Sequence, residues 1–79
     1  MQKNYWRIKC NHTPETIDRI MLAFRKRGLC VDALQYKKIS DSLAECEVEF
    51  QEEAENANRI YKNIIRLVDI TEIEILETA

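Results

Sequence analysis

Residues 44–51 alternate apolar and polar side chains without interruption, and this segment constrains the fold more than any other part of the chain. The two sets are Ala44, Cys46, Val48 and Phe50 on one side, and Glu45, Glu47, Glu49 and Gln51 on the other. Successive side chains of a β-strand point to opposite faces, so the pattern predicts a strand with one buried and one acidic face. The chain must therefore build a sheet that buries one side.

Three further segments favour strands. Residues 5–10 and 71–77 alternate in the same way, and residues 29–39 favour a strand whose alternation slips between Ala33 and Leu34, as at a β-bulge. The side chains that we expect to face the core from the first and last of these strands are Trp6, Ile8, Cys10, Ile73 and Ile75.

Two segments carry apolar residues at helical spacing. The first begins with Thr13 as N-cap and Pro14 in the first helical position, and Gly28 follows its last turn as a left-handed C-terminal cap. The second covers residues 52–67, with carboxylates in its first turn. The expected core-facing stripes are Ile17, Ile20, Met21 and Phe24 in the first helix, and Ala57, Ile60, Tyr61, Ile64 and Ile65 in the second.

The predicted order is strand, helix, strand, strand, helix, strand, which is the order of the ferredoxin-like βαββαβ fold. Right-handed crossovers place both helices on one face of a four-stranded antiparallel sheet, and each strand then needs one apolar side. A chain of 79 residues has room for one domain. We therefore predict an α+β fold in which residues 1–79 form a single domain, with a core over about residues 5–76.

Composition limits the chemistry that the chain can carry. It contains one glycine, one histidine and three cysteines. One glycine excludes glycine-rich phosphate-binding loops, and one histidine cannot form a multi-histidine metal centre. Cys10, Cys30 and Cys46 are odd in number and widely spaced, so we expect reduced, mainly structural thiols. We expect no catalytic residue, no metal site and no cofactor.

The charges disfavour nucleic acid and membrane as partners. Twelve basic and fourteen acidic residues give a net charge of -2, and residues 44–51 present carboxylates where an RNA-recognition sheet needs base-stacking aromatics. Arg7 and Lys9 lie opposite acidic positions of the neighbouring strands, which indicates a solvated ladder of ion pairs. No apolar run approaches the roughly 20 residues that span a bilayer, and charges near the start exclude a signal peptide. We expect a cytoplasmic protein.

His12 lies in the loop before the first helix, where backbone N–H groups and the helix dipole favour a carboxylate ligand. A loop of this kind could sense an amino acid. Glu15, in the first helical turn, already places its own negative charge in this positive potential. The alternative interpretation of His12 is an exposed loop residue without a ligand.

Two stretches are more specific than the fold. Residues 11–36 and 66–75 together closely resemble the small regulatory subunits of acetolactate synthase, also called acetohydroxyacid synthase, whose regulatory module is an ACT domain. The features that carry the resemblance are Pro14, Glu15, Thr16 and Ile17 followed by Arg19, then Arg27 and Gly28, and later Leu67, Val68, Asp69 and Ile70. The match is with the short form, made of one ACT domain.

The resemblance implies a non-catalytic subunit that binds a large catalytic subunit and raises its activity. The catalytic partner uses thiamine diphosphate, magnesium and FAD in the pathway to valine, leucine and isoleucine. It also implies a homodimer, because two apolar second strands at the sheet edge pair side by side about a two-fold axis in the usual ACT dimer. The alternative is a free-standing ACT-type module for amino-acid sensing or dimerisation, with no synthase partner.

Three positions depart from the pattern of the valine-responsive family members. Those members carry an N-x-x-G pattern after the first strand and a second Asn two residues after the glycine that ends the first helix. In this chain His12 takes the place of the first Asn, Glu15 that of the glycine, and Cys30 that of the second Asn. A side chain and a negative charge at Glu15 oppose a ligand carboxylate. We therefore expect these effector-pocket positions to bind valine weakly or not at all.

Overall fold

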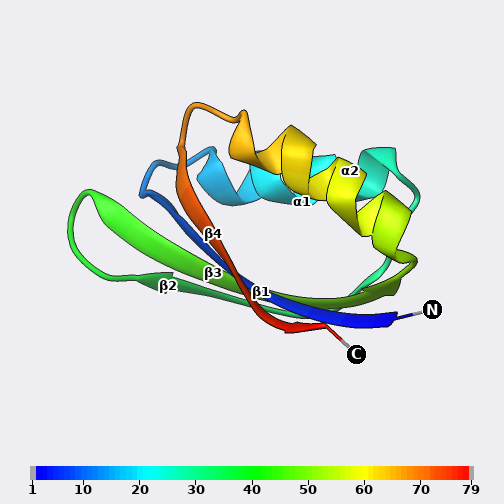
Figure 1. The fold of residues 1–79 in the computed structure, drawn as a ribbon. Coiled ribbons are helices and arrows are strands. Elements are labelled where there is room, and N and C mark those ends of the chain that lie inside the picture. The colour runs from blue at the N-terminus through cyan, green and yellow to red at the C-terminus, as the bar shows by residue number, and fades with distance from the viewer. Residues whose placement is uncertain (1, 79) are drawn as a thin grey trace.

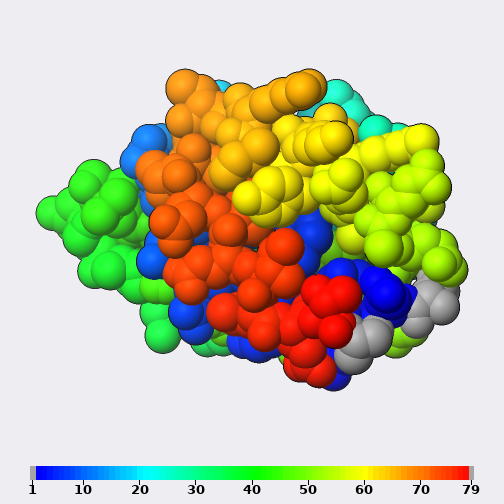
Figure 2. Space-filling model, viewed as in Figure 1, coloured from blue at the N-terminus to red at the C-terminus, as the bar shows by residue number. Residues whose placement is uncertain are grey.

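All four expected strands and both expected helices are present in the computed structural model, which describes residues 2–78. The elements are β1 (Gln2–Asn11), α1 (Thr16–Lys26), β2 (Val31–Lys38), β3 (Leu43–Glu52), α2 (Ala54–Ile65) and β4 (Ile70–Thr78). The strand order is β2-β3-β1-β4, and every neighbouring pair is antiparallel. Both helices cover one face of the sheet (Figure 1), and α2 lies beside β4 (Figure 2). The predicted ferredoxin-like α+β fold is confirmed.

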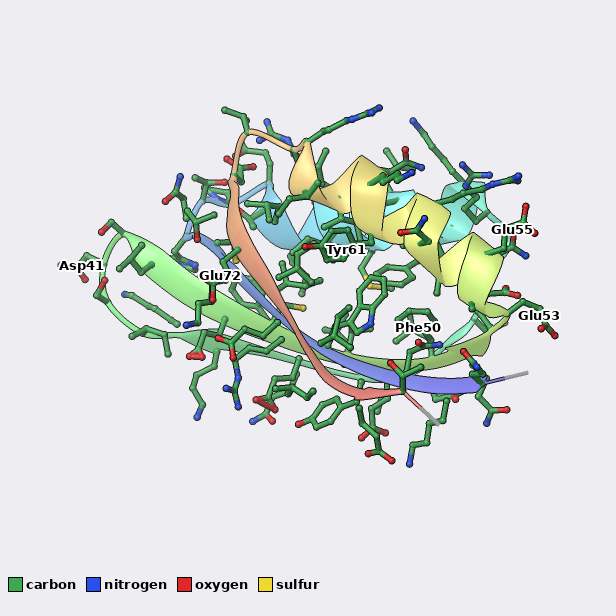
Figure 3. All side chains as sticks on the ribbon, in the orientation of Figure 1. Asp41, Phe50, Glu53, Glu55, Tyr61 and Glu72 are labelled. Carbon is green, nitrogen blue, oxygen red and sulfur yellow. The ribbon has the colours of Figure 1, made fainter. Side chains whose placement is uncertain are left out.

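The core lies between the helices and the sheet, and aromatic rings fill its centre. Trp6 of β1 meets Phe50 of β3 edge to face, with ring centroids 4.9 Å apart, and meets Tyr61 of α2 at 5.9 Å. Phe24 of α1 packs on Phe50 at 5.1 Å. Figure 3 shows Phe50 and Tyr61 in the layer between the sheet and the helices. Residues 44–50 and the first strand thus bury the faces that the alternation predicted.

The first helix begins at Thr16, two residues after the predicted start at Pro14. The reason lies in the Thr16 side chain, which is buried and holds the preceding loop in a turn. Its Oγ1 donates a hydrogen bond to the Asn11 carbonyl at 2.8 Å and accepts one from the Thr13 N–H at 3.2 Å. Thr13 therefore stands outside the helix, and its prediction as N-cap was wrong. At the other end, Gly28 has φ 70°, as expected for a left-handed cap.

Three details of the strands and of α2 differ from the sequence prediction. The slip in β2 falls between Val31 and Ala33, one step earlier than expected. The helix α2 is shorter than residues 52–67, because Glu52 still pairs with Gln2 in the sheet. Ile65, in the last turn of α2, is 37% exposed, although the spacing placed it on the core side.

Ile75 is also exposed, although the alternation of residues 71–77 predicts that it faces the core. It lies opposite Trp6 in the sheet, but 57% of its surface is accessible. It belongs to β4, which is an edge strand with a register shift just beyond Ile75. The helix layer covers Ile73 but leaves Ile75 open beside α2. Periodicity gives the face on which a side chain lies, and only the packing of α2 decides whether that face is covered.

Candidate functional site

The loop between β1 and α1 contains His12 and Glu15, two of the three predicted effector-pocket positions. His12 is half-buried, and its Nδ1 is hydrogen-bonded to the Tyr36 hydroxyl of β2 at 2.9 Å. The two rings also lie close, with centroids 5.7 Å apart. The His12 backbone N–H donates to the Ser42 carbonyl at 2.8 Å. The interpretation of His12 as an exposed loop residue is therefore wrong, because its side chain links the loop to the end of β2.

Glu15 is the residue immediately before α1. Its side chain is exposed and makes no capping hydrogen bond to the helix N–H groups. Its carboxylate nevertheless stands at the positive end of the helix dipole, in the potential that a ligand carboxylate would use. The structure thus places a negative charge of the chain itself where an anionic ligand would approach.

Cys30, the third predicted position, lies at the other end of α1. It is exposed and precedes β2 by one residue. A helix rises about 1.5 Å per residue, so the 11 residues of α1 separate Cys30 from Glu15 by the whole length of the helix. The chain brings His12 and Glu15 to one end of α1 but does not bring Cys30 to them. A pocket that used all three positions would need two copies of the chain.

The loop after β1 is also tied to the turn before β4. The Arg19 guanidinium of α1 forms an ion pair with the buried Asp69 carboxylate, and the Asn11 N–H donates to the Asp69 carbonyl at 2.7 Å. Arg19 and Asp69 come from the two stretches that carry the family resemblance. Sequence reasoning singled out both residues as parts of a pattern but missed their contact. It missed Tyr36 as well. The available signal was its hydroxyl group, because the other β2 residues packed against the core, Val31 and Leu34, are purely apolar.

The open face of the sheet carries the expected ladder of opposite charges. Arg7 contacts Glu45, Glu47 and Glu74, with the closest approach at 3.2 Å to Glu47, and Lys9 contacts Glu74 at 2.7 Å. The hydrogen bonds from Tyr5 and Arg7 lower the pKa of Glu47. The hydrogen bond from Lys9 likewise lowers the pKa of Glu74. These carboxylates are ionised and paired within the chain, as in a solvated surface ladder.

Two of the three cysteines are core residues. Cys10 and Cys46 are buried, and Cys10 Sγ donates to the Ala44 carbonyl at 3.5 Å. Burial raises the pKa of the Cys10 thiol and raises that of Cys46 to about 12. Both thiols are therefore protonated at neutral pH, where the thiolate is the reactive form. Only Cys30 is exposed to reagents.

A thiol titration measures this difference. We expect one fast-reacting thiol per native chain with a disulfide reagent at mildly alkaline pH, and three after unfolding, because Cys10 and Cys46 are buried and protonated. Cys30→Ser is the matched control and should remove the fast phase while leaving two thiols in the unfolded chain. Two or three fast thiols in the native protein would show that the core is open to solvent.

The described residues offer no sign of a metal centre or a membrane span. No group of three His, Cys, Asp or Glu side chains within residues 2–78 is placed to hold a metal ion. Neither described helix is both long and apolar enough to cross a bilayer.

Comparisons with known proteins identify the fold. No family model and no curated protein matches the chain. Among solved structures, the ACT domain from GTP pyrophosphokinase of Chlorobium tepidum superposes with a TM-score of 0.80 at 12% identity, covering 94% of this chain and 96% of that one. The acetolactate synthase small subunit from Thermotoga maritima gives 0.82 at 12% identity, with 95% of this chain covered. The regulatory subunit of aspartate kinase from Thermus thermophilus gives 0.71 at 13%, covering 92% of this chain and 50% of that one.

The chain therefore has the fold of an ACT domain. Its structural relatives include an acetolactate synthase small subunit, of which it spans about half, namely 47% of that chain. Identities of 12–13% establish the shared fold alone. The function follows from the particular residues that this chain places on it.

Proposed function

We propose that this chain is a non-catalytic regulatory subunit of acetolactate synthase, which binds the large catalytic subunit and raises its activity. The observation that carries the proposal is the contact between Arg19 and Asp69. These residues belong to the two separate stretches that resemble the family, and the ACT fold brings them into one ion pair beside the β1–α1 loop. The two stretches that resemble the family are therefore in contact in the folded chain.

On this proposal residues 1–79 are a single ACT domain, and the chemistry belongs to the partner. Thiamine diphosphate, magnesium and FAD are held by the large subunit, in the cytoplasm, and this chain contributes no catalytic residue. The isolated chain would then show no acetolactate formation of its own.

The proposal includes a homodimer through β2. This strand is at the sheet edge, and an unpaired edge presents backbone N–H and C=O groups to a second strand. In a two-fold antiparallel pair, the start of one β2 lies beside the end of the other. Cys30 of one copy would then approach the end of β2 in the second copy, where Tyr36 holds His12. Two copies would bring together the three positions that one copy separates.

The alternative is a free-standing ACT-type module that senses an amino acid or dimerises, without a synthase. The observation in its favour is the equally good superposition on the Chlorobium tepidum ACT domain, which this chain matches over 96% of its length. That domain belongs to a GTP pyrophosphokinase, so the fold alone fits either role.

Mixing the chain with the large subunit from the same source separates the two functions. We expect co-purification and a several-fold rise in acetolactate formation per large subunit. The test variant is Arg19→Met, which removes the ion pair with Asp69. The matched control is Arg25→Met, which removes an exposed arginine of the same helix that forms no described ion pair. Arg19→Met should weaken the activation and Arg25→Met should not. Without co-purification or activation, the free-standing module is the correct function.

Valine should bind this chain weakly or not at all, because the Glu15 carboxylate stands at the helix end where the carboxylate of valine would dock. Calorimetric titration of the purified chain should show no saturable heat at micromolar valine. Glu15→Gly restores the family glycine and removes the charge, and any valine response should be stronger in that variant. Micromolar binding of valine to the unmodified chain would contradict the prediction.

A further inference from the structure

A pocket lies away from the effector positions, in the groove between β1, α2 and β4. Its volume is about 220 Å³, and its walls include Trp6 and Gln2 of β1, Tyr61 of α2 and Ile75 of β4. Figure 2 shows this recess between α2 and β4, with the first strand at its floor. His12, Glu15 and Cys30 are not among its lining residues.

Two polar atoms in the walls of this pocket lack partners. Within residues 2–78, the buried side-chain atoms without a hydrogen bond are Trp6 Nε1 and Gln2 Oε1. Trp6 is only 2% exposed, so its indole N–H has no access to solvent. A buried donor or acceptor without a partner destabilises the fold. Both residues line the pocket, so a molecule that is admitted when the Gln2 side chain moves can satisfy the closed-off donor and acceptor together.

The other lining residues indicate which class of ligand the pocket fits. None of the nine lining residues carries a charge, in a chain in which 33% of the residues are charged. The walls are mainly apolar, with Ile75 exposed beside the Tyr61 ring. Walls that are mainly apolar and carry no charged residue exclude a bare ionic group.

We propose that this pocket binds a small uncharged molecule with an apolar body and one carboxamide or hydroxyl group. The oxygen of the ligand accepts a hydrogen bond from Trp6 Nε1–H, and its own N–H or O–H donates to Gln2 Oε1. Gln2 is half-buried at the end of β1, so its side chain can turn aside to admit the polar group. A cavity of about 150 Å³ suffices for benzene, so this pocket admits a single ring or a short branched chain.

Trp6 is the only tryptophan, and its indole N–H gives a single resonance that reports directly on the proposed hydrogen bond. The test titrates the full chain with benzamide and follows that resonance by proton–nitrogen correlation NMR. We expect a saturable downfield shift at millimolar benzamide. Benzoate has the same shape with a charge, and toluene lacks the polar group. Because a missing hydrogen bond or a buried charge costs at least about 1.4 kcal/mol, each should bind about tenfold more weakly.

Two variants locate the binding. Ala54→Phe fills the mouth of the pocket from an exposed position of α2, and should abolish the shift. Ala33→Phe makes the same change at an exposed position of β2 outside the pocket, and should leave it intact. Gln2→Leu removes the acceptor and should reduce the preference of the pocket for benzamide over toluene, because the Trp6 donor remains. An unmoved indole resonance, equal binding of the three probes, or an undiminished shift in Ala54→Phe would overturn the proposal.

Discussion

Phe24→Ala is expected to lower the free energy of unfolding by about 3–5 kcal/mol, the range for removing a buried phenylalanine ring. Phe24 is fully buried and is the aromatic side chain through which α1 joins the core, since its ring packs on Phe50 at 5.1 Å and lies 6.5 Å from Trp6. Removing the ring leaves a cavity between α1 and the sheet. The loss is a large share of the total, because small domains are stable by only about 5–15 kcal/mol.

Urea unfolding followed by the fluorescence of the single tryptophan measures this loss. The matched control is Leu22→Ala on the same helix, since Leu22 is 41% exposed and its truncation should cost less than about 1 kcal/mol. If Phe24→Ala does not fold, Phe24→Leu retains most of the volume and should fold with a smaller loss. A cost for Phe24→Ala no larger than that for Leu22→Ala would show that the aromatic cluster does not anchor α1.

The long one-sided segments of this chain could be read correctly from sequence. The alternation in residues 44–51 extends over a whole strand, and the central position of β3 covers its apolar face completely. The Gly28 cap was predictable as well, because a glycine that follows three cationic residues is a local signal for the end of a helix, and Gly28 has the expected positive φ. In these elements the local sequence pattern agrees with the face that is buried, so their structure could be predicted without knowing which other elements pack against them.

The differences occur where a distant contact decides the local structure. Pro14 and Thr13 form a good helix start by local rules, but the buried Thr16 hydroxyl binds Asn11 and delays the helix. Ile75 has the correct face but stays exposed, because it borders the open groove beside α2. Periodicity contains no information about either contact.

The candidate sites divide in the same way. Sequence alignment with the family could mark His12, Glu15 and Cys30, but it could not show that α1 holds Cys30 apart from the other two. The partnership of His12 with Tyr36 joins residues that are 24 positions apart, and the pocket at Trp6 needs three elements packed together. Residues that one loop places together can be recognised from sequence, and contacts that the packing forms cannot.

The second large effect is expected at the β2 edge. Some backbone N–H groups of this strand point to β3 and others point to the free edge, and a proline can remove either kind. The Ile39 N–H donates to the Leu43 carbonyl of β3 at 2.9 Å. Backbone groups alternate in direction along an antiparallel strand, so those of Lys37 also point to β3, whereas those of Lys38 point outward to the free edge. Both lysine side chains are exposed. Proline at either position removes the same charge but a different hydrogen bond.

Lys38→Pro should leave the chain folded and weaken the proposed homodimer, because it removes an outward donor from both copies of the proposed two-fold interface. Two hydrogen bonds at about 1 kcal/mol each correspond to about a 30-fold weaker dimer. Lys37→Pro should instead destabilise the fold, since it breaks the ladder between β2 and β3. Sedimentation equilibrium at tens of micromolar measures the association, and thermal unfolding measures the fold. A monomeric parent chain would overturn the proposed homodimer, and an undiminished dimer in Lys38→Pro would place its interface elsewhere than at β2.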